Sequence, residues 1–317
     1  MTDRETLERI RRLVIPPGWD SVWICPWPHG HIQAVGVDAK GRRQYRYHDD
    51  WRRLRDREKF DHMVRFGTDL PRLRRKVVRA LKTFDSNRDP SRDEVLASAV
   101  RLLDLGCFRI GSDSYAEENG TYGLASMETR HVRVGRNRIS FDFTAKGGQR
   151  CTQDVTDPLV AAVVRRLKSR RPAKSRLLAA KEGRRWTEVD SNQINAFIKT
   201  ATGGDFTAKD FRTWKATVLA GACLAKRAGG SSAQARKRSV AAAMKDVAEY
   251  LGDTPAVARS SYVDPRVVDL YMDGVTVDPT LGRDLSPVAI ADSTAWSRLE
   301  AAVLDLLDER GEHSRAA

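Results

Sequence analysis

Strand-like segments are concentrated in two short stretches of this chain, and this distribution constrains the fold more than any other feature. The first stretch contains segments at residues 21–25, 31–37 and 42–48, with a hairpin turn over residues 38–41. The second is a small meander of segments at residues 130–134, 138–144 and 149–155. Since the remaining chain is mostly helical in pattern, the sequence predicts an α+β fold.

Helical patterns fill most of the chain outside these two stretches. The clearest covers residues 91–108, where Ser91 and Glu94 form a capping box before an apolar face. Thr2 and Glu5 form a similar pair at the start of a short helix over residues 2–12. The other expected helices cover residues 49–65, 70–81, 159–170, 191–201, 208–227, 233–251, 255–262, 265–272 and 294–310.

The break at residues 66–68 is the expected hinge between two domains, with the loop at residues 85–90 as the alternative. The sequence thus predicts three parts. They are a β-rich N-terminal domain over residues 1–67, a mainly helical domain over 68–292, and a C-terminal helix and tail of unknown role over 293–317.

Positive charge is in excess, with a formal net charge of +14 over 317 residues. Residues 1–90 carry +8 of this surplus, which is more than half of it in less than a third of the chain. Such a surplus favours a polyanionic partner, and nucleic acid fits better than a membrane because no basic amphipathic helix with an aromatic face stands out.

Several classes of site are not indicated by the sequence. There is no GxxxxGK[ST] motif, no GxGxxG after a strand, no HExxH and no GxSxG, so neither a nucleotide cofactor nor a metal is expected. The four cysteines are scattered without a CxxC pair, which is typical of a reducing cytoplasm. No apolar run reaches 18 residues, and the first residues lack the apolar core of a signal peptide.

Residues 44–48 place polar and aromatic side chains alternately along one predicted strand. Gln44 and Arg46 would face one side, where they could contact bases or phosphates, and Tyr45 and Tyr47 would face the other. The alternative is an ordinary amphipathic strand with its two tyrosines in the core.

A second set of candidates is spread along the larger predicted domain. Arg109 follows a strongly apolar helix, where a guanidinium needs an anion to be tolerated, and Lys146 lies at a glycine-rich hairpin tip. Lys209 and Arg212 lie one turn apart on a helix, and Tyr262 lies between two helices that begin with proline. Each feature alone is more often structural, so their order carries the argument.

In this order, these residues resemble the active site of type IB DNA topoisomerases, and the poxvirus-like branch found in bacteria is the most similar. The similarity covers roughly residues 8–272 and includes Phe108-Arg109-Ile110-Gly111, Lys209-Asp210-Phe211-Arg212-Thr213-Trp214 and the segment from Leu251 to Tyr262. The resemblance implies a C-shaped clamp around duplex DNA, a fold shared in its catalytic domain with tyrosine recombinases, and a monomer without cofactor.

The resemblance also implies a role for each residue. Tyr262 would attack the scissile phosphodiester and form a 3′-phosphotyrosyl enzyme, which relaxes supercoils without ATP or metal. Arg109 and Arg212 would hold the non-bridging oxygens, Lys146 would protonate the leaving oxygen and Lys209 would support the phosphate site. The remaining DNA contacts would come from Gln44, Tyr45, Arg46, Tyr47 and Tyr115.

Asp253 departs from the family pattern, which has His or Asn nine residues before the nucleophile. An ionised carboxylate only accepts hydrogen bonds and repels a phosphate. Asp253 is therefore expected to point away, to be protonated in the complex, or to slow cleavage. Two rival functions are a tyrosine recombinase, although Lys209 stands where that class has His, and a DNA-binding module that has lost activity.

Overall fold

The computed structural model describes residues 3–111, 119–169, 171–229, 232–282 and 293–311. Within it the chain divides into two compact units, Met1–His62 and Met63–Ala317. The expected α+β fold is confirmed, because one three-stranded antiparallel sheet belongs to the first unit and mainly helices with small sheets form the second.

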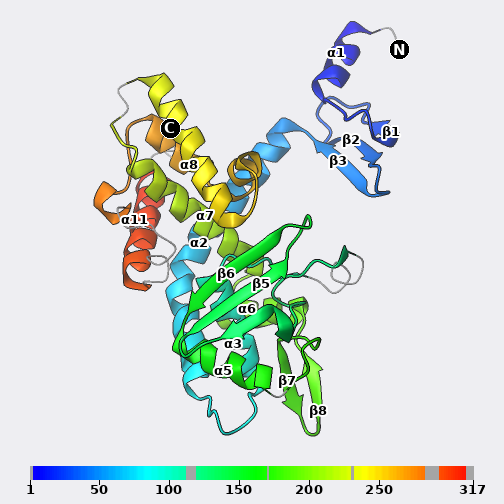
Figure 1. Ribbon diagram of the computed structural model, residues 1–317. Coiled ribbons are helices and arrows are strands. Elements are labelled where there is room, and N and C mark those ends of the chain that lie inside the picture. The colour runs from blue at the N-terminus through cyan, green and yellow to red at the C-terminus, as the bar shows by residue number, and fades with distance from the viewer. Residues whose placement is uncertain (1–2, 112–118, 170, 230–231, 283–292, 312–317) are drawn as a thin grey trace. The chain divides into compact units, whose positions relative to one another are not determined.

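The first unit holds a helix and a meander (Figure 1). Its elements are α1 (Arg4–Arg12), β1 (Asp20–Ile24), β2 (Ile32–Val37), β3 (Arg43–Tyr47) and the start of α2 (Asp49–Lys82). Asp3, and not the expected Thr2, caps α1 by accepting hydrogen bonds from the main chain of Glu5 and Thr6, while Thr2 lies outside the described residues. Arg9 joins α1 to the sheet by donating to the buried Gln33 at 2.7 Å.

The two helices expected at residues 49–65 and 70–81 are one continuous helix, α2. Gly67 is helical and packs against the indole of the buried Trp214, where an added Cβ would lie 2.6 Å from the ring. Glycine normally weakens the interior of a helix, so the residue type at position 67 wrongly indicated a break. A glycine is needed there because of a contact with a residue far along the chain.

The second unit holds the remaining elements, several of which are labelled in Figure 1. They are α3 (Arg92–Leu105), η1 (Thr129–His131), β4 (Val132–Val134), β5 (Arg138–Thr144), β6 (Arg150–Thr156), α5 (Pro158–Ser169), β7 (Ala179–Glu182), β8 (Arg185–Glu188), α6 (Ser191–Thr202), α7 (Ala208–Ala225), α8 (Ala233–Leu251), α9 (Pro255–Val257), η2 (Ala258–Tyr262), α10 (Pro265–Met272), η3 (Pro279–Gly282) and α11 (Ser293–Gly311). The capping box of Ser91 and Glu94 is present at the start of α3, as expected. The β7–β8 hairpin was not predicted.

Helix α7 forms the centre of the second unit. It packs against α3, α6, α8, α10 and α11, and nearly all of its residues from Phe211 to Ala225 are buried. A helix that is apolar on all sides belongs in the interior of a domain. Two cationic side chains, Arg212 and Lys215, are therefore carried into the core, and each needs acceptors there.

The C-terminal helix α11 packs on α7 and α10. Its buried face contains Trp296, Leu299 and Val303, as expected, together with Leu307, whereas the expected Leu306 is only half-buried. The helix is thus part of the core of the second unit.

Candidate active site

Arg212 enters the site from the buried helix α7. Its side chain is only 5% exposed, and it donates to the main-chain oxygen of Cys107 and, at 2.9 Å, to that of Leu251. The Nε atom is buried and has no hydrogen-bond partner in the described part of the chain. Since a guanidinium stays charged when buried, these carbonyl groups fix its position without cancelling its charge.

Arg109 lies in the segment that follows α3. It donates to the main-chain oxygen of Gly252 at 3.1 Å, and its own carbonyl accepts a hydrogen bond from Leu124. Gly111 and Gly123 let two backbone segments approach closely here: a Cβ on Gly123 would lie 2.5 Å from Gly111. This close packing sets the course of the segment that presents Arg109.

Asp253 connects the two arginines. Helix α8 ends at Gly252, whose φ of 62° favours glycine, and the chain then turns Asp253 toward the guanidinium groups. One carboxylate oxygen accepts from Arg109 at 2.8 Å and the other accepts from Arg212 at 2.8 Å. Two cations thus converge on one small anion, whose side chain is 15% exposed.

Tyr262 ends a π-helical turn, η2, which begins directly after α9. The carbon at the centre of the Arg212 guanidinium lies 5.3 Å from the centroid of its ring. Thr217 of α7 donates to its main-chain oxygen at 3.3 Å, while its hydroxyl makes no hydrogen bond to any residue that the structure describes. π-Helical turns often occur at functional sites because they redirect a side chain. A phenol therefore lies beside the arginine pair.

The two candidate lysines lie on the surface. Lys146 follows β5 in the hairpin that leads to β6, and Lys209 lies in the first turn of α7. Both are exposed, and within the described residues neither side chain makes an ion pair. They are accessible to a ligand. Tyr115, the remaining candidate of this unit, lies outside the described residues.

The candidates of the first unit lie on β3 and are described within that unit alone. Tyr45 and Tyr47 are 41% and 40% exposed, with ring centroids 6.0 Å apart, so the alternative that places them in the core is wrong. Gln44 donates to Asp38 at 2.9 Å and Arg46 donates to the main chain of Val14 at 2.9 Å. Tyr45 and Tyr47, like Arg43, are exposed on this strand, whereas Gln44 and Arg46 are half-buried and have partners within the unit.

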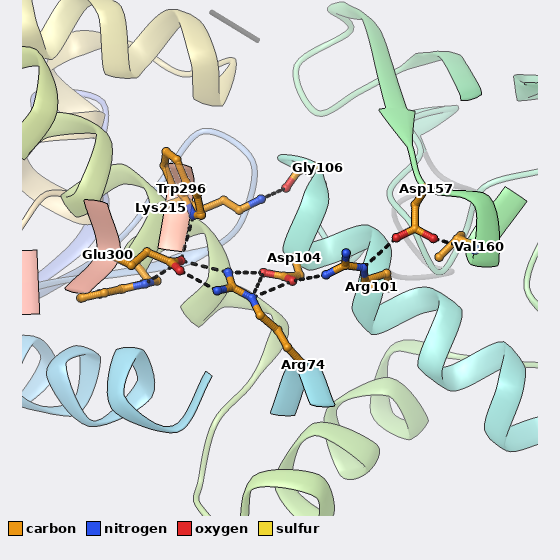
Figure 2. A network of polar contacts seen from close by, with 10 residues as sticks. Arg74, Arg101, Asp104, Gly106, Asp157, Val160, Lys215, Trp296 and Glu300 are labelled. Carbon is orange, nitrogen blue, oxygen red and sulfur yellow. Dashed lines mark hydrogen bonds and ion pairs between the residues drawn. The ribbon is translucent and has the colours of Figure 1, made fainter. Parts of the chain in front are cut away.

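A buried lysine of α7, Lys215, belongs to the network of polar contacts drawn in Figure 2. Lys215 of α7 donates to the main-chain oxygen of Gly106 at 2.9 Å, so α7 holds the segment before Arg109 through both Lys215 and Arg212. Burial lowers the pKa of Lys215, although the nearby Cys107 and Asp104 oppose this shift. Sequence reasoning missed Lys215, although its place in an otherwise apolar helical run was a visible signal.

Sequence reasoning also missed a cluster of weak acids beside the arginines. Burial raises the pKa of Tyr250 well above its ordinary value, and the Cys107 thiol adds to this shift. Burial likewise raises the pKa of Cys151, while the positive charge of Arg109 acts in the opposite direction. These side chains therefore remain neutral, and the charge of the site comes from the two arginines and Asp253.

Among the described residues, no three His, Cys, Asp or Glu side chains form a group that could hold a metal ion. No helix in the described ranges is both long and apolar enough to cross a membrane.

Comparison with protein families gives two matches. Residues 48–272 match the family described as the catalytic core of eukaryotic DNA topoisomerase I. Residues 1–38 match the N-terminal domain of bacterial DNA topoisomerase IB. The first match spans the arginines, Asp253 and Tyr262.

Individual relatives agree with these matches. The chain is 30% identical over 275 residues to DNA topoisomerase 1B of Acanthamoeba polyphaga mimivirus, which covers 84% of this chain and 80% of the relative. It is 24% identical over 247 residues to DNA topoisomerase 1B of vaccinia virus (strain Copenhagen), covering 75% and 72%. DNA topoisomerase 1 of Mycosarcoma maydis is 25% identical over 219 residues, covering 63% of this chain but 20% of that protein.

Proposed function

The chain belongs to the type IB DNA topoisomerases, the family that its motifs resemble, and we propose that it relaxes supercoiled duplex DNA by transesterification at Tyr262. The observation that carries this mechanism is the convergence of Arg109 and Arg212 on one anion beside the Tyr262 ring. A phosphodiester in that position would lie next to a phenol and between two fixed cations.

In the proposed cleavage step, the Tyr262 oxygen attacks the phosphorus and the bond to the 5′ oxygen breaks. Negative charge grows on the non-bridging oxygens, and fixed guanidinium groups stabilise it without a metal. Arg212 suits this role because carbonyl groups already orient it in a dry environment. Asp253 lies between the two cations and lowers the net positive charge of the site.

Lys146 is proposed as the acid that protonates the departing 5′ oxygen. Its exposure at a glycine-rich hairpin allows it to reach a bound strand, and a neutral alcohol leaves more easily than an alkoxide. Lys209, exposed at the start of α7, is proposed to contact the neighbouring phosphate. The covalent ester retains the energy of the backbone bond, so religation needs no ATP.

The first unit is proposed to grip the same duplex through Tyr45 and Tyr47. Tyrosine rings pack on sugars, and their hydroxyl groups donate to phosphates. Gln44 and Arg46 would need to release their present partners to contact DNA, and Tyr115 is proposed as a phosphate contact from the larger unit.

We also propose that the chain acts as a monomer in the cytoplasm.

The test is incubation with supercoiled plasmid in EDTA and without ATP. We expect the parent chain to relax the plasmid, and Tyr262→Phe to bind DNA without relaxing it. Tyr271→Phe is the matched control, because this buried tyrosine of α10 only donates to the main chain of Arg227. Retained DNA binding without relaxation at any salt concentration would favour an inactive DNA-binding module.

A further inference from the structure

The carboxylate of Asp253 makes the contacts that a phosphate would make with the arginine pair. Its two oxygens accept from two different guanidinium groups, each at 2.8 Å. The non-bridging oxygens of a phosphodiester likewise share one negative charge and accept from paired arginines. A bound phosphate and this carboxylate therefore compete for the same N–H groups.

The arginines do not depend on Asp253 for their positions. Arg212 keeps the main-chain oxygens of Cys107 and Leu251, and Arg109 keeps that of Gly252. These carbonyl groups carry no net charge, so they orient the guanidinium groups while leaving them attractive to an anion. Among the residues that the structure describes, the Asp253 carboxylate is the one group that forms an ion pair with either guanidinium, and it neutralises one of the two positive charges.

The carboxylate is also able to leave. Its side chain is partly exposed, and the main-chain N–H of Asp253 is held separately by the carbonyl of Ala248. Rotation about the Cα–Cβ bond would therefore withdraw the carboxylate while the backbone of the segment stays in place.

We propose that Asp253 is an internal counter-ion that occupies the phosphate position between Arg109 and Arg212 until an incoming phosphate displaces it. This inference rests on the proposed role of the arginine pair in phosphate binding. In this proposal Asp253 acts through the two arginines: it lowers the affinity of the empty site for anions and keeps the buried Arg212 paired.

A purely structural role for Asp253 predicts the opposite change in anion affinity when the carboxylate is removed. If the carboxylate only held the arginines in place, removing its charge would loosen them and weaken anion binding. A competing carboxylate predicts tighter binding when its charge is removed. Asp253→Asn separates these cases because the amide has the same shape, keeps one acceptor oxygen and gains a donor.

The experiment measures sulfate binding to the full chain by calorimetry and by the resonances of 15N-labelled arginine side chains. We expect Asp253→Asn to bind sulfate at least tenfold more tightly than the parent chain, and Arg109→Gln in that background to abolish the gain. Asp246→Asn is the matched control, because it makes the same change of charge at an ion pair with Arg227 and should leave binding unchanged. Equal or weaker sulfate binding by Asp253→Asn would overturn the proposal.

A second measurement uses the parent chain, so it does not depend on the folding of a variant. With 13C in the aspartate carboxyl groups, addition of a short duplex should shift the Asp253 resonance. This resonance is assigned by its loss in Asp253→Asn or, if that variant does not fold, by its loss in Asp253→Ser. An unchanged resonance at saturating duplex contradicts displacement. If the parent chain fails to relax plasmid but Asp253→Asn still binds sulfate more tightly, only the proposed function is rejected. If the parent chain relaxes plasmid but Asp253→Asn does not bind sulfate more tightly, only the proposed counter-ion role of Asp253 is rejected.

Discussion

Arg74 of α2 and Glu300 of α11 are paired although 226 residues separate them along the chain. Two hydrogen bonds of 2.5 and 2.9 Å join them, and the Glu300 side chain is only 8% exposed. Arg74 also pairs with the buried Asp104 of α3, while the indoles of Trp214 and Trp296 donate to Glu300 (Figure 2). The C-terminal helix is thereby attached to the same network that supports α7.

Glu300→Gln should destabilise the protein by about 3 kcal/mol, because it leaves a buried arginine with one carboxylate instead of two. Urea unfolding followed by circular dichroism measures this change. Glu182→Gln is the control, since Glu182 forms an exposed pair with Arg92 and should cost less than about 1 kcal/mol. Equal losses in the two variants would mean that the buried network contributes no more than a surface pair.

Asp104 should make stability depend on acid. Burial is the largest single influence and raises the pKa of this carboxyl, but the charge and hydrogen bonds of Arg74, together with the charges of Lys215 and Arg101, hold the pKa below its ordinary value. An acid with a depressed pKa in the folded state contributes stability above its unfolded pKa of about 4 and loses it as pH falls through the folded value. Asp104→Asn should be less stable at pH 7, and its stability should fall less steeply below about pH 4. Parallel curves for parent and variant in urea titrations from pH 7 to pH 2 would contradict this assignment.

Local signals predicted much of the fold, and contacts between distant segments explain what they missed. The capping box at Ser91 needs only residues within one turn, so the sequence was sufficient to place the start of α3. A glycine is needed at position 67 because the ring of Trp214 packs there, and no local window around Gly67 contains Trp214. The β7–β8 hairpin turns at Gly183, whose φ is 60°, but its strands contain few of the β-branched residues that indicate a strand.

Gly67→Ala should destabilise the second unit, although alanine is the better helix former. The gain in helix propensity is about 1 kcal/mol, whereas forcing a methyl group against the buried Trp214 ring costs about 1–3 kcal/mol. Thermal unfolding compares this variant with Gly135→Ala, where the new Cβ would meet its neighbour at 3.5 Å. A rise in melting temperature for Gly67→Ala would show that the ring moves aside.

Lys146→Ala should slow cleavage by about 10²–10⁴-fold if Lys146 is the general acid. A substrate with sulfur in place of the leaving 5′ oxygen should restore the rate, because a thiolate leaves without protonation. Single-turnover cleavage of both substrates measures the effect, and Lys174→Ala, an exposed lysine of the same unit, serves as the control. Equal slowing on both substrates would assign Lys146 to binding instead.

In the candidate site, too, the order of the residues along the chain could be predicted, but the direction of one side chain could not. The order of Arg109, Lys146, Lys209, Arg212 and Tyr262 could be read directly from the sequence, and this order, more than any single feature, carried the resemblance. The direction of Asp253 could not, because it depends on the end of α8 at Gly252 meeting two arginines from other segments. The sequence identified Asp253 as a negatively charged residue where a phosphate is expected to bind, and the structure shows that it pairs with both cations.

Replacing Tyr45 and Tyr47 together by alanine should weaken binding to duplex DNA by about tenfold, or ~1.4 kcal/mol, with little loss of stability. Both rings are exposed in the free chain, so their removal leaves no cavity, and any lost energy belongs to the DNA contact. Fluorescence anisotropy at two salt concentrations separates this loss from the electrostatic part of binding, because counterion release depends on lysine and arginine. The double Phe variant tests the hydroxyl groups alone, and Leu54→Ala, which removes another exposed apolar side chain of the same unit, is the control. Unchanged affinity in the double alanine variant would mean that the DNA contact lies on another surface of the β1–β3 sheet. A loss of affinity that the double phenylalanine variant does not restore would assign the contact to hydrogen bonds between the tyrosine hydroxyl groups and phosphate.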